Sequence, residues 1–240
     1  MRTPIFIFFL VFAAASFAQE IPLGTWRTHL SFTSVSHIAG GNATLFAASE
    51  NAVMVYSISD NSFDVYSTLN TLSSTGITSI GYDAARKQLL VGYEDGNLDL
   101  ISETSSVNFT RLVNPPDVGT AGTIRHIDVV GNVAYFSTGY GVVLFDLVRN
   151  EVRETWRNLG AAGQLLAINQ SIVLSDSIYL ATANGILKGK LTDNLLDFNQ
   201  WTRFSSGDFN KNINHIIVFN NKIFTAIDNE GIFRYNGAAW

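Results

Sequence analysis

The 240-residue sequence contains no cysteine. This absence excludes disulfides, thiolate catalysis and cysteine-ligated metal sites, and it excludes a lipoprotein anchor, which needs a cysteine after the cleavage site. Charged residues make up only 15% of the chain and the formal net charge is −5, so the basic footprint of a nucleic-acid-binding protein is missing. Hydrophobic residues reach 47%, which excludes a disordered tail.

Motifs of catalysis are missing as well. The chain has no Gly-x-Ser-x-Gly elbow, no glycine-rich phosphate loop before a helix, and no Ser-x-Asp-x-Gly-x-x-Trp aspartate box. Glu94 and Asp95 fall in an expected hairpin and Asp99 in the strand after it, which indicates a solvated turn and no acid/base pair. The sequence therefore predicts a non-enzymatic protein with no catalytic, cofactor-binding or metal residue, and it leaves the binding residues unassigned.

The chain contains a repeat instead. Residues 124–146 form three apolar runs separated by Gly131-Asn132 and by a turn that ends at Gly141. Glycine supplies the positive φ that such turns need, so this stretch predicts three strands joined by two tight turns. A fourth strand is expected at 151–156, which would complete one antiparallel blade.

The same unit occurs five times in the chain. Its anchor, in the middle of the second strand, recurs every 44 or 45 residues, and a glycine or alanine follows six or seven residues later. The anchors are Phe46, Leu90, Tyr135, Tyr179 and Phe224, followed by Ala52, Gly96, Gly141, Gly185 and Gly231. First strands are expected at 35–38, 77–80, 124–127, 165–168 and 213–216. This period predicts an all-β propeller of four-stranded antiparallel blades.

The two ends of the chain carry further signals. Residues 1–18 combine Arg2, an apolar run and a small-residue cleavage site, which predicts a secretory signal, so the propeller would occupy residues 19–240. Trp26 marks an outer strand without inner strands before it, and Trp240 falls where the fifth outer strand should start. We interpret the chain as part of a longer propeller. A five-bladed ring without its last strand is the alternative.

Two kinds of residue are candidates for a functional site. His37, His126 and His215 each lie nine residues before an anchor, on strands that line a propeller channel. Zinc ligands must lie about 2 Å from one point, whereas the intervening blades would hold these side chains apart, so each is expected to hydrogen-bond a neighbouring loop. Asn42, Asn108 and Asn169 begin glycosylation triplets, which we interpret as turn or strand residues.

Four passages resemble the N-terminal β-propellers of the PorZ family, surface components of the type IX secretion system in Bacteroidetes. They are residues 24–32 (GTWRTHLSF), 89–101 (LLVGYEDGNLDLI), 134–143 followed by 151–155, and 178–186 followed by 191–197 and Trp201. The resemblance covers essentially all of residues 19–240. It implies that the five blades belong to a seven-bladed ring, within a protein that has two such propellers and a terminal immunoglobulin-like sorting domain.

The resemblance also implies a function. PorZ-type proteins belong to the attachment complex with the sortase PorU and with PorV and PorQ, and they bind anionic lipopolysaccharide without being catalytic. The expected place of this protein is accordingly the periplasm or the outer-membrane cell surface. Two alternatives stay open, namely the periplasmic sensor of a hybrid two-component regulator and a polysaccharide-processing enzyme. The sensor is disfavoured because its typical Trp-x-Gly-Thr hairpin is absent.

Overall fold

A computed structural model describes residues 30–41, 43–110, 112 and 122–240. The described propeller unit is Ser31–Trp240. The expected secretory signal and the strand expected around Trp26 lie outside the described residues. Within the part that is described, no helix is long and apolar enough to cross a membrane.

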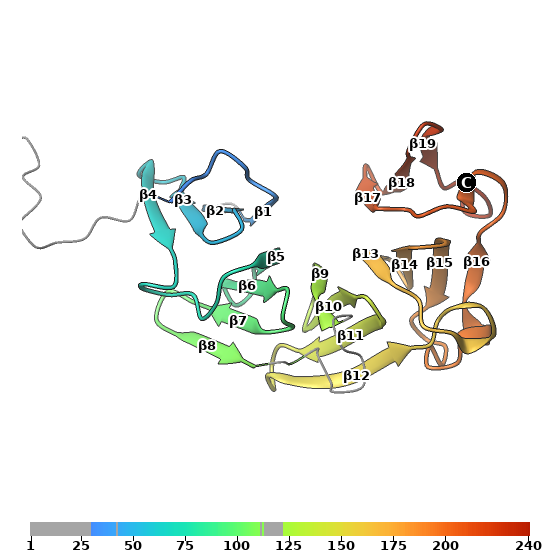
Figure 1. Cartoon of the computed structure of the whole chain (residues 1–240), viewed down its shortest axis with the longest axis horizontal. Coiled ribbons are helices and arrows are strands. Elements are labelled where there is room, and N and C mark those ends of the chain that lie inside the picture. The colour runs from blue at the N-terminus through green and yellow to red at the C-terminus, as the bar shows by residue number, and fades with distance from the viewer. Residues whose placement is uncertain (1–29, 42, 111, 113–121) are drawn as a thin grey trace, which may run out of the picture. The chain divides into compact units, whose positions relative to one another are not determined.

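The unit consists of antiparallel sheets, which we number as blades 1 to 5 in chain order (Figure 1). Blade 1 contains β1 (His37–Gly40), β2 (Thr44–Ala48), β3 (Val53–Ser57) and β4 (Ser62–Tyr66). Blade 2 contains β5 (Ile77–Asp83), β6 (Gln88–Tyr93), β7 (Leu98–Ile101) and β8 (Ser106–Phe109). Blade 3 contains β9 (Ile124–Val130), β10 (Val133–Thr138), β11 (Gly141–Asp146) and β12 (Glu151–Arg157).

The remaining two blades follow the same order. Blade 4 contains β13 (Ile168–Leu174), β14 (Ser177–Thr182), β15 (Gly185–Lys190) and β16 (Thr202–Phe204). Blade 5 contains β17 (His215–Phe219), β18 (Lys222–Ile227) and β19 (Gly231–Arg234) among the described residues. Within each blade, sequential strands pair antiparallel, and Figure 1 shows the first strand of each blade at its inner end. The all-β propeller fold is therefore confirmed.

The repeat anchors are confirmed at their expected place. Each anchor is the third residue of a second strand, namely β2, β6, β10, β14 or β18. The first strand expected at 165–168 is wrong, because β13 begins only at Ile168, whose partner across the sheet is Thr182. The residues before it contain a 3₁₀ turn at Ala161–Gly163, so the connection from blade 3 is longer than the apolar pattern suggested.

The core is divided among the interfaces between consecutive blades. Successive strand residues point to opposite faces of a sheet. In β10, Tyr135 accordingly packs in the apolar cluster shared with blade 4, while Phe136 packs in the cluster shared with blade 2. Similar clusters join blade 1 to blade 2 and blade 4 to blade 5. Both faces of a middle blade are thus buried, which a single sheet could not achieve.

Candidate functional site

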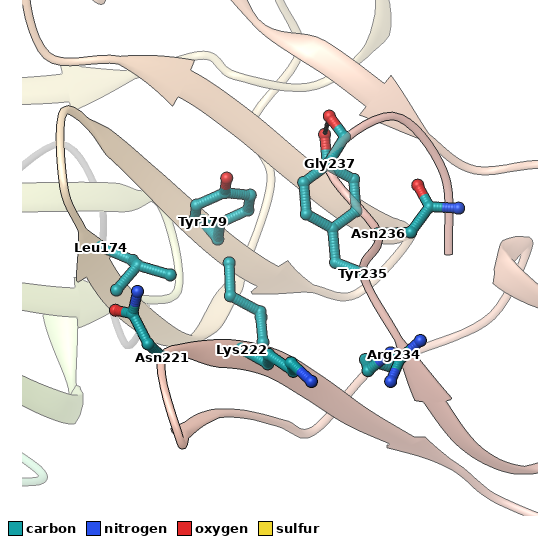
Figure 2. Close-up of a pocket in the computed structure, with 9 residues that line it drawn as sticks. Leu174, Tyr179, Asn221, Lys222, Arg234, Tyr235, Asn236 and Gly237 are labelled. Carbon is teal, nitrogen blue, oxygen red and sulfur yellow. Dashed lines mark hydrogen bonds between the residues drawn. The ribbon is translucent and has the colours of Figure 1, made fainter.

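A pocket of about 410 Å³ opens between blades 4 and 5 (Figure 2). We call it the tyrosine pocket. One wall comes from β13 and β14, with Leu174 and Tyr179, and the other comes from blade 5. The blade 5 residues that line it are Asn221, Lys222, Ile223, Arg234, Tyr235, Asn236 and Gly237. The second-strand anchor of blade 4 is therefore a pocket residue.

Two of the lining residues are tyrosines, and both contact Lys188, which does not itself line the pocket. The rings of Tyr179 and Tyr235 meet edge to face, with centroids 5.6 Å apart and planes at 64°. Lys188 is the cross-strand partner of Tyr179, so both side chains lie on the same face of blade 4. Its ammonium lies 5.6 Å from the Tyr179 centroid and 5.3 Å from the Tyr235 centroid, and it donates to Tyr235 Oη at 3.3 Å. These contacts hold the two rings and one positive charge together.

The pocket carries more positive than negative charge. Burial lowers the pKa of Lys188, but its hydrogen bond to Tyr235 and the charges of both tyrosines raise it more, so the net pKa lies above 10.5. Lys222 and Arg234 are exposed. Among the described residues, none of the three cations forms an ion pair with a carboxylate. The nearby Asp176 pairs instead with Lys190, at 3.8 Å.

The acidic residues singled out in the sequence do not form a site. Glu94 and Asp95 are exposed, as expected of a solvated turn. The same expectation is wrong for Asp99, which is fully buried and accepts hydrogen bonds from Ser73, Tyr93 and Asn108. The position of Asp99 on β7, where its side chain contacts Ser73, Tyr93 and Asn108, determines its environment, and the neighbouring turn does not. This carboxylate is structural.

The repeated histidines lie on the first strands of blades 1, 3 and 5, and a glutamine takes the same position in blade 4. Gln170 occupies the same repeat position in blade 4, since it pairs with Ala181 as His126 pairs with Ser137 and His215 with Ala226. Its amide nitrogen lies 3.3 Å from Nε2 of His126, and its oxygen accepts from Ile216 N–H at 3.1 Å. His215 Nδ1 also approaches that oxygen, at 3.4 Å. The prediction of bonds to neighbouring loops is therefore wrong for His126 and His215.

This arrangement fixes the state of His126. Because a glutamine amide nitrogen can only donate, Nε2 of His126 accepts and its proton is on Nδ1. Nδ1 is buried and has no hydrogen-bond partner in the described part of the chain. Burial, followed by the charges of His37 and His215, lowers the pKa of His126 to about 4. The described residues include no group of three or more His, Cys, Asp or Glu arranged to hold a metal ion.

Asp128 faces blade 4 from the same strand as His126. Its carboxylate accepts a hydrogen bond from Val173 N–H at 3.0 Å. Burial raises its pKa to about 6, although hydrogen bonds from Val173 and Val129 oppose this shift. The strand β9 thus carries a histidine whose pKa is lowered and a carboxyl group whose pKa is raised, so burial favours the neutral form of both.

These two residues predict compensating pH effects on stability. Below its ordinary pKa of 6.5, His126 takes up protons first in the unfolded chain, so its contribution to stability falls as the pH drops toward 4. Asp128 takes up a proton first in the folded chain, so its contribution rises as the pH drops from 6 toward 3.8. For each residue, the difference between its pKa in the folded protein and its ordinary pKa corresponds to about 3 kcal/mol of unfolding free energy.

Single substitutions should separate these contributions. Between pH 7 and pH 4, Asp128→Asn is expected to lose about 3 kcal/mol of unfolding free energy relative to wild type, and His126→Gln to gain about as much. Urea unfolding at several pH values measures both differences. The double variant is the matched control, and its difference from wild type should vary little with pH. Flat differences for both single variants would contradict the assignment.

Sequence reasoning missed the tyrosine pocket. Lys188, Lys222, Arg234 and Tyr235 belong to no motif, and their pattern is visible only once blades 4 and 5 are adjacent. Gln170 could have been found, because it lies nine residues before the anchor Tyr179, at the spacing of the three histidines. A polar glutamine at the repeat position that histidine occupies in other blades indicates that this position contributes to the same inner surface. The glycosylation triplet at Asn108 proves structural, because its amide donates to Ser73 and Asp99.

Comparison with solved structures supports the fold. The chain is 21% identical to PorZ, described as an essential surface component of the type IX secretion system of Porphyromonas gingivalis, with a TM-score of 0.73, and the match covers 88% of this chain and 28% of that one. The extracellular domain of a hybrid two-component system from B. thetaiotaomicron is 16% identical, with a TM-score of 0.66 and coverage of 88% and 28%. The WD40 propeller domain of Doa1 is 14% identical, with a TM-score of 0.61 and coverage of 83% and 64%.

The family assignment comes from the sequence itself. No curated protein matches the chain. The chain spans 28% of the length of the PorZ structure that it resembles. The family model of the PorZ N-terminal β-propeller domain of the type IX secretion system matches residues 45–202, which extend from β2 to the start of β16. The chain therefore belongs to the family of PorZ N-terminal β-propeller domains.

Proposed function

We propose that this chain is a non-enzymatic, exported propeller that serves the attachment complex of the type IX secretion system. The family match over residues 45–202 is the observation that carries the proposal. Its proposed partners are the sortase PorU, the proteins PorV and PorQ, and anionic lipopolysaccharide. The signal pattern in residues 1–18 supports export through the inner membrane to the periplasm or the outer-membrane cell surface. The remainder, residues 19–240, acts in this proposal as a single propeller domain.

A scaffold role agrees with the chemistry of the described residues. The buried carboxylate of Asp99 is fully engaged by Ser73, Tyr93 and Asn108, so it is not available as an acid or base. The charged residues that line the tyrosine pocket are both cations and lie beside two aromatic rings, which suits binding better than hydrolysis. Binding residues in repeat proteins typically come from several units, and the residues that line the tyrosine pocket come from two blades.

A sensor propeller is the second candidate. Its support is the similarity to the extracellular domain of a two-component system from B. thetaiotaomicron, at a TM-score of 0.66. In this role the propeller would bind a ligand outside the inner membrane and transmit its occupancy to a regulator. The two candidates differ in what the cell loses when the protein is removed.

Gene deletion in the encoding bacterium distinguishes them. If the proposal is correct, the deletion strain retains the sorting domain on secreted cargo and loses anchored cargo from its surface, and complementation restores both. Mass spectrometry of cargo C-termini and surface labelling measure these outcomes. Normal cargo processing, combined with loss of a transcriptional response to a glycan, would refute the secretion role and support the sensor.

A further inference from the structure

We propose that the tyrosine pocket binds an acidic sugar residue, whose ring packs on Tyr179 and Tyr235 and whose carboxylate or phosphate binds Lys222 and Arg234. The inference rests on the proposed function in one respect, since it gives the acidic surface glycan of that proposal a location on this chain. The pocket itself and its chemistry are independent of the family.

The aromatic pair offers a surface for an apolar sugar face. Tyr179 is only 6% exposed, so it forms the floor, while Tyr235 is partly exposed and forms a wall. Tyr235 is fixed in place by donating its hydroxyl to the carbonyl of Gly237 at 2.7 Å. Ligand pockets combine such apolar walls with a few oriented polar groups, and the volume of about 410 Å³ lies within their usual range.

The charges favour an anion. On a chain with a net charge of −5, both charged residues that line the pocket, Lys222 and Arg234, are cations, and neither has a carboxylate partner in the described structure. The partly buried Lys188 adds a third positive charge beside the two rings, since it hydrogen-bonds both Tyr235 and Tyr179. An anionic group in the pocket would therefore gain charge-assisted hydrogen bonds from Lys222 and Arg234.

Two amides at the rim suit sugar hydroxyls. Asn220 and Asn221 both have positive φ, at 49° and 58°, which fits the two-residue turn between β17 and β18. This turn brings Asn221 to one end of the pocket in Figure 2. At the other end, Asn236 Oδ1 accepts from the backbone N–H groups of Ala238 and Ala239, both at 2.9 Å, which leaves its amide nitrogen to donate.

An acidic peptide is the competing ligand for a cationic pocket. A peptide needs a sheet edge or a long groove for its backbone, whereas this pocket is short and lined by side chains of two blades. Aromatic rings, two cations and an amide at each end of the pocket together suit a single substituted sugar ring. We therefore favour the sugar, and the peptide becomes an outcome of the test.

The experiment measures binding of defined probes by titration calorimetry. Uronate oligomers from alginate test the carboxylate, a phosphomannan tests the phosphate, and dextran is the neutral control. The purified protein is compared with Lys222→Gln/Arg234→Gln and with Tyr235→Leu. Arg149→Gln is the matched control, because Arg149 is an exposed cation on the β11–β12 turn of blade 3.

Binding of one acidic probe, weakened at least about tenfold by each pocket variant and unchanged in Arg149→Gln, is the expected result. The probe that binds identifies the acidic group. Equal binding of dextran, displacement by polyglutamate, unchanged affinity in the pocket variants, or no binding of either acidic probe would overturn the inference. If no acidic probe binds the pocket but the deletion strain shows the expected defects in cargo processing and anchoring, the secretion role stands and only the pocket inference fails. The two proposals can therefore fail separately.

Discussion

Replacing Asp99 by alanine is expected to lower the free energy of unfolding by about 4 kcal/mol, among the largest effects of any single substitution in this chain. The carboxylate is 0% exposed and accepts four hydrogen bonds. Its partners are Ser73 N–H at 2.8 Å, Ser73 Oγ at 2.6 Å, Tyr93 Oη at 2.6 Å and Asn108 Nδ2 at 2.8 Å. Removing it leaves the buried Tyr93 hydroxyl without its acceptor and breaks hydrogen bonds from Ser73 and Asn108 as well.

Tyr93 shows how strongly this carboxylate is coupled to its surroundings. The tyrosine is fully buried, and burial, followed by its hydrogen bond to Asp99, raises its pKa well above the ordinary value of 10. Its hydroxyl would have no alternative acceptor of equal strength after the substitution. The double variant Asp99→Ala/Tyr93→Phe should consequently lose less than the sum of the two single losses.

Chemical denaturation of the variants provides the measurement. Asp64→Ala is a suitable control, because Asp64 lies on an outer strand of blade 1 and is exposed, and among the described residues its side chain accepts a hydrogen bond only from Val65 N–H. It should change stability by less than about 0.5 kcal/mol. A loss below about 1 kcal/mol for Asp99→Ala would show that the hydrogen-bonded cluster is not a determinant of blade 2 stability.

Gly185→Ala is expected to destabilise the protein by about 3 kcal/mol. Gly185 begins β15 with φ at +79°, a conformation that L residues with a side chain avoid. A Cβ added there would lie 2.1 Å from the carbonyl oxygen of Phe204 and 2.8 Å from that of Phe209. Both obstacles are backbone atoms, so relief requires moving β16 and the 3₁₀ turn Gly207–Phe209 away from β15.

Gly207→Ala separates the two costs. Gly207 also has a positive φ, at +58°, but a Cβ would meet nothing within 4 Å. This control should therefore cost only the conformational part, about 1 kcal/mol. Thermal or urea unfolding of both variants gives the comparison. Equal losses in the two variants would mean that the contact with the outer strand is not what restricts position 185.

The glycine positions illustrate what the sequence could predict. Gly96, Gly141, Gly185 and Gly231 were identified by spacing, and all have positive φ. Their conformational role therefore follows from local chemistry. The contact with the outer strand could not be anticipated, because the carbonyls that approach Gly141 and Gly185 come from residues more than a dozen positions later. The repeat spacing predicts where turns occur, whereas the close approach of another backbone segment depends on how the outer strand packs beside the glycine.

The site was harder to predict for the same reason. Tyr179 was recognised as an anchor, but its partner Tyr235 lies in another blade and belongs to no repeated position. Asp99 was misjudged because residues near a turn are usually solvated, and only its contacts with Ser73 and Asn108 show otherwise. Sequence patterns thus predicted the blades well, and they failed where function or stability depends on residues brought together from separate units.

The division of the core among blade interfaces has an evolutionary consequence. Each apolar cluster is shared by two consecutive blades only, so a blade has to match its two neighbours and no common centre. Duplication or exchange of a blade by recombination therefore disturbs two contacts and leaves the other units intact. Sites formed between blades, such as the tyrosine pocket, can in turn diverge one interface at a time.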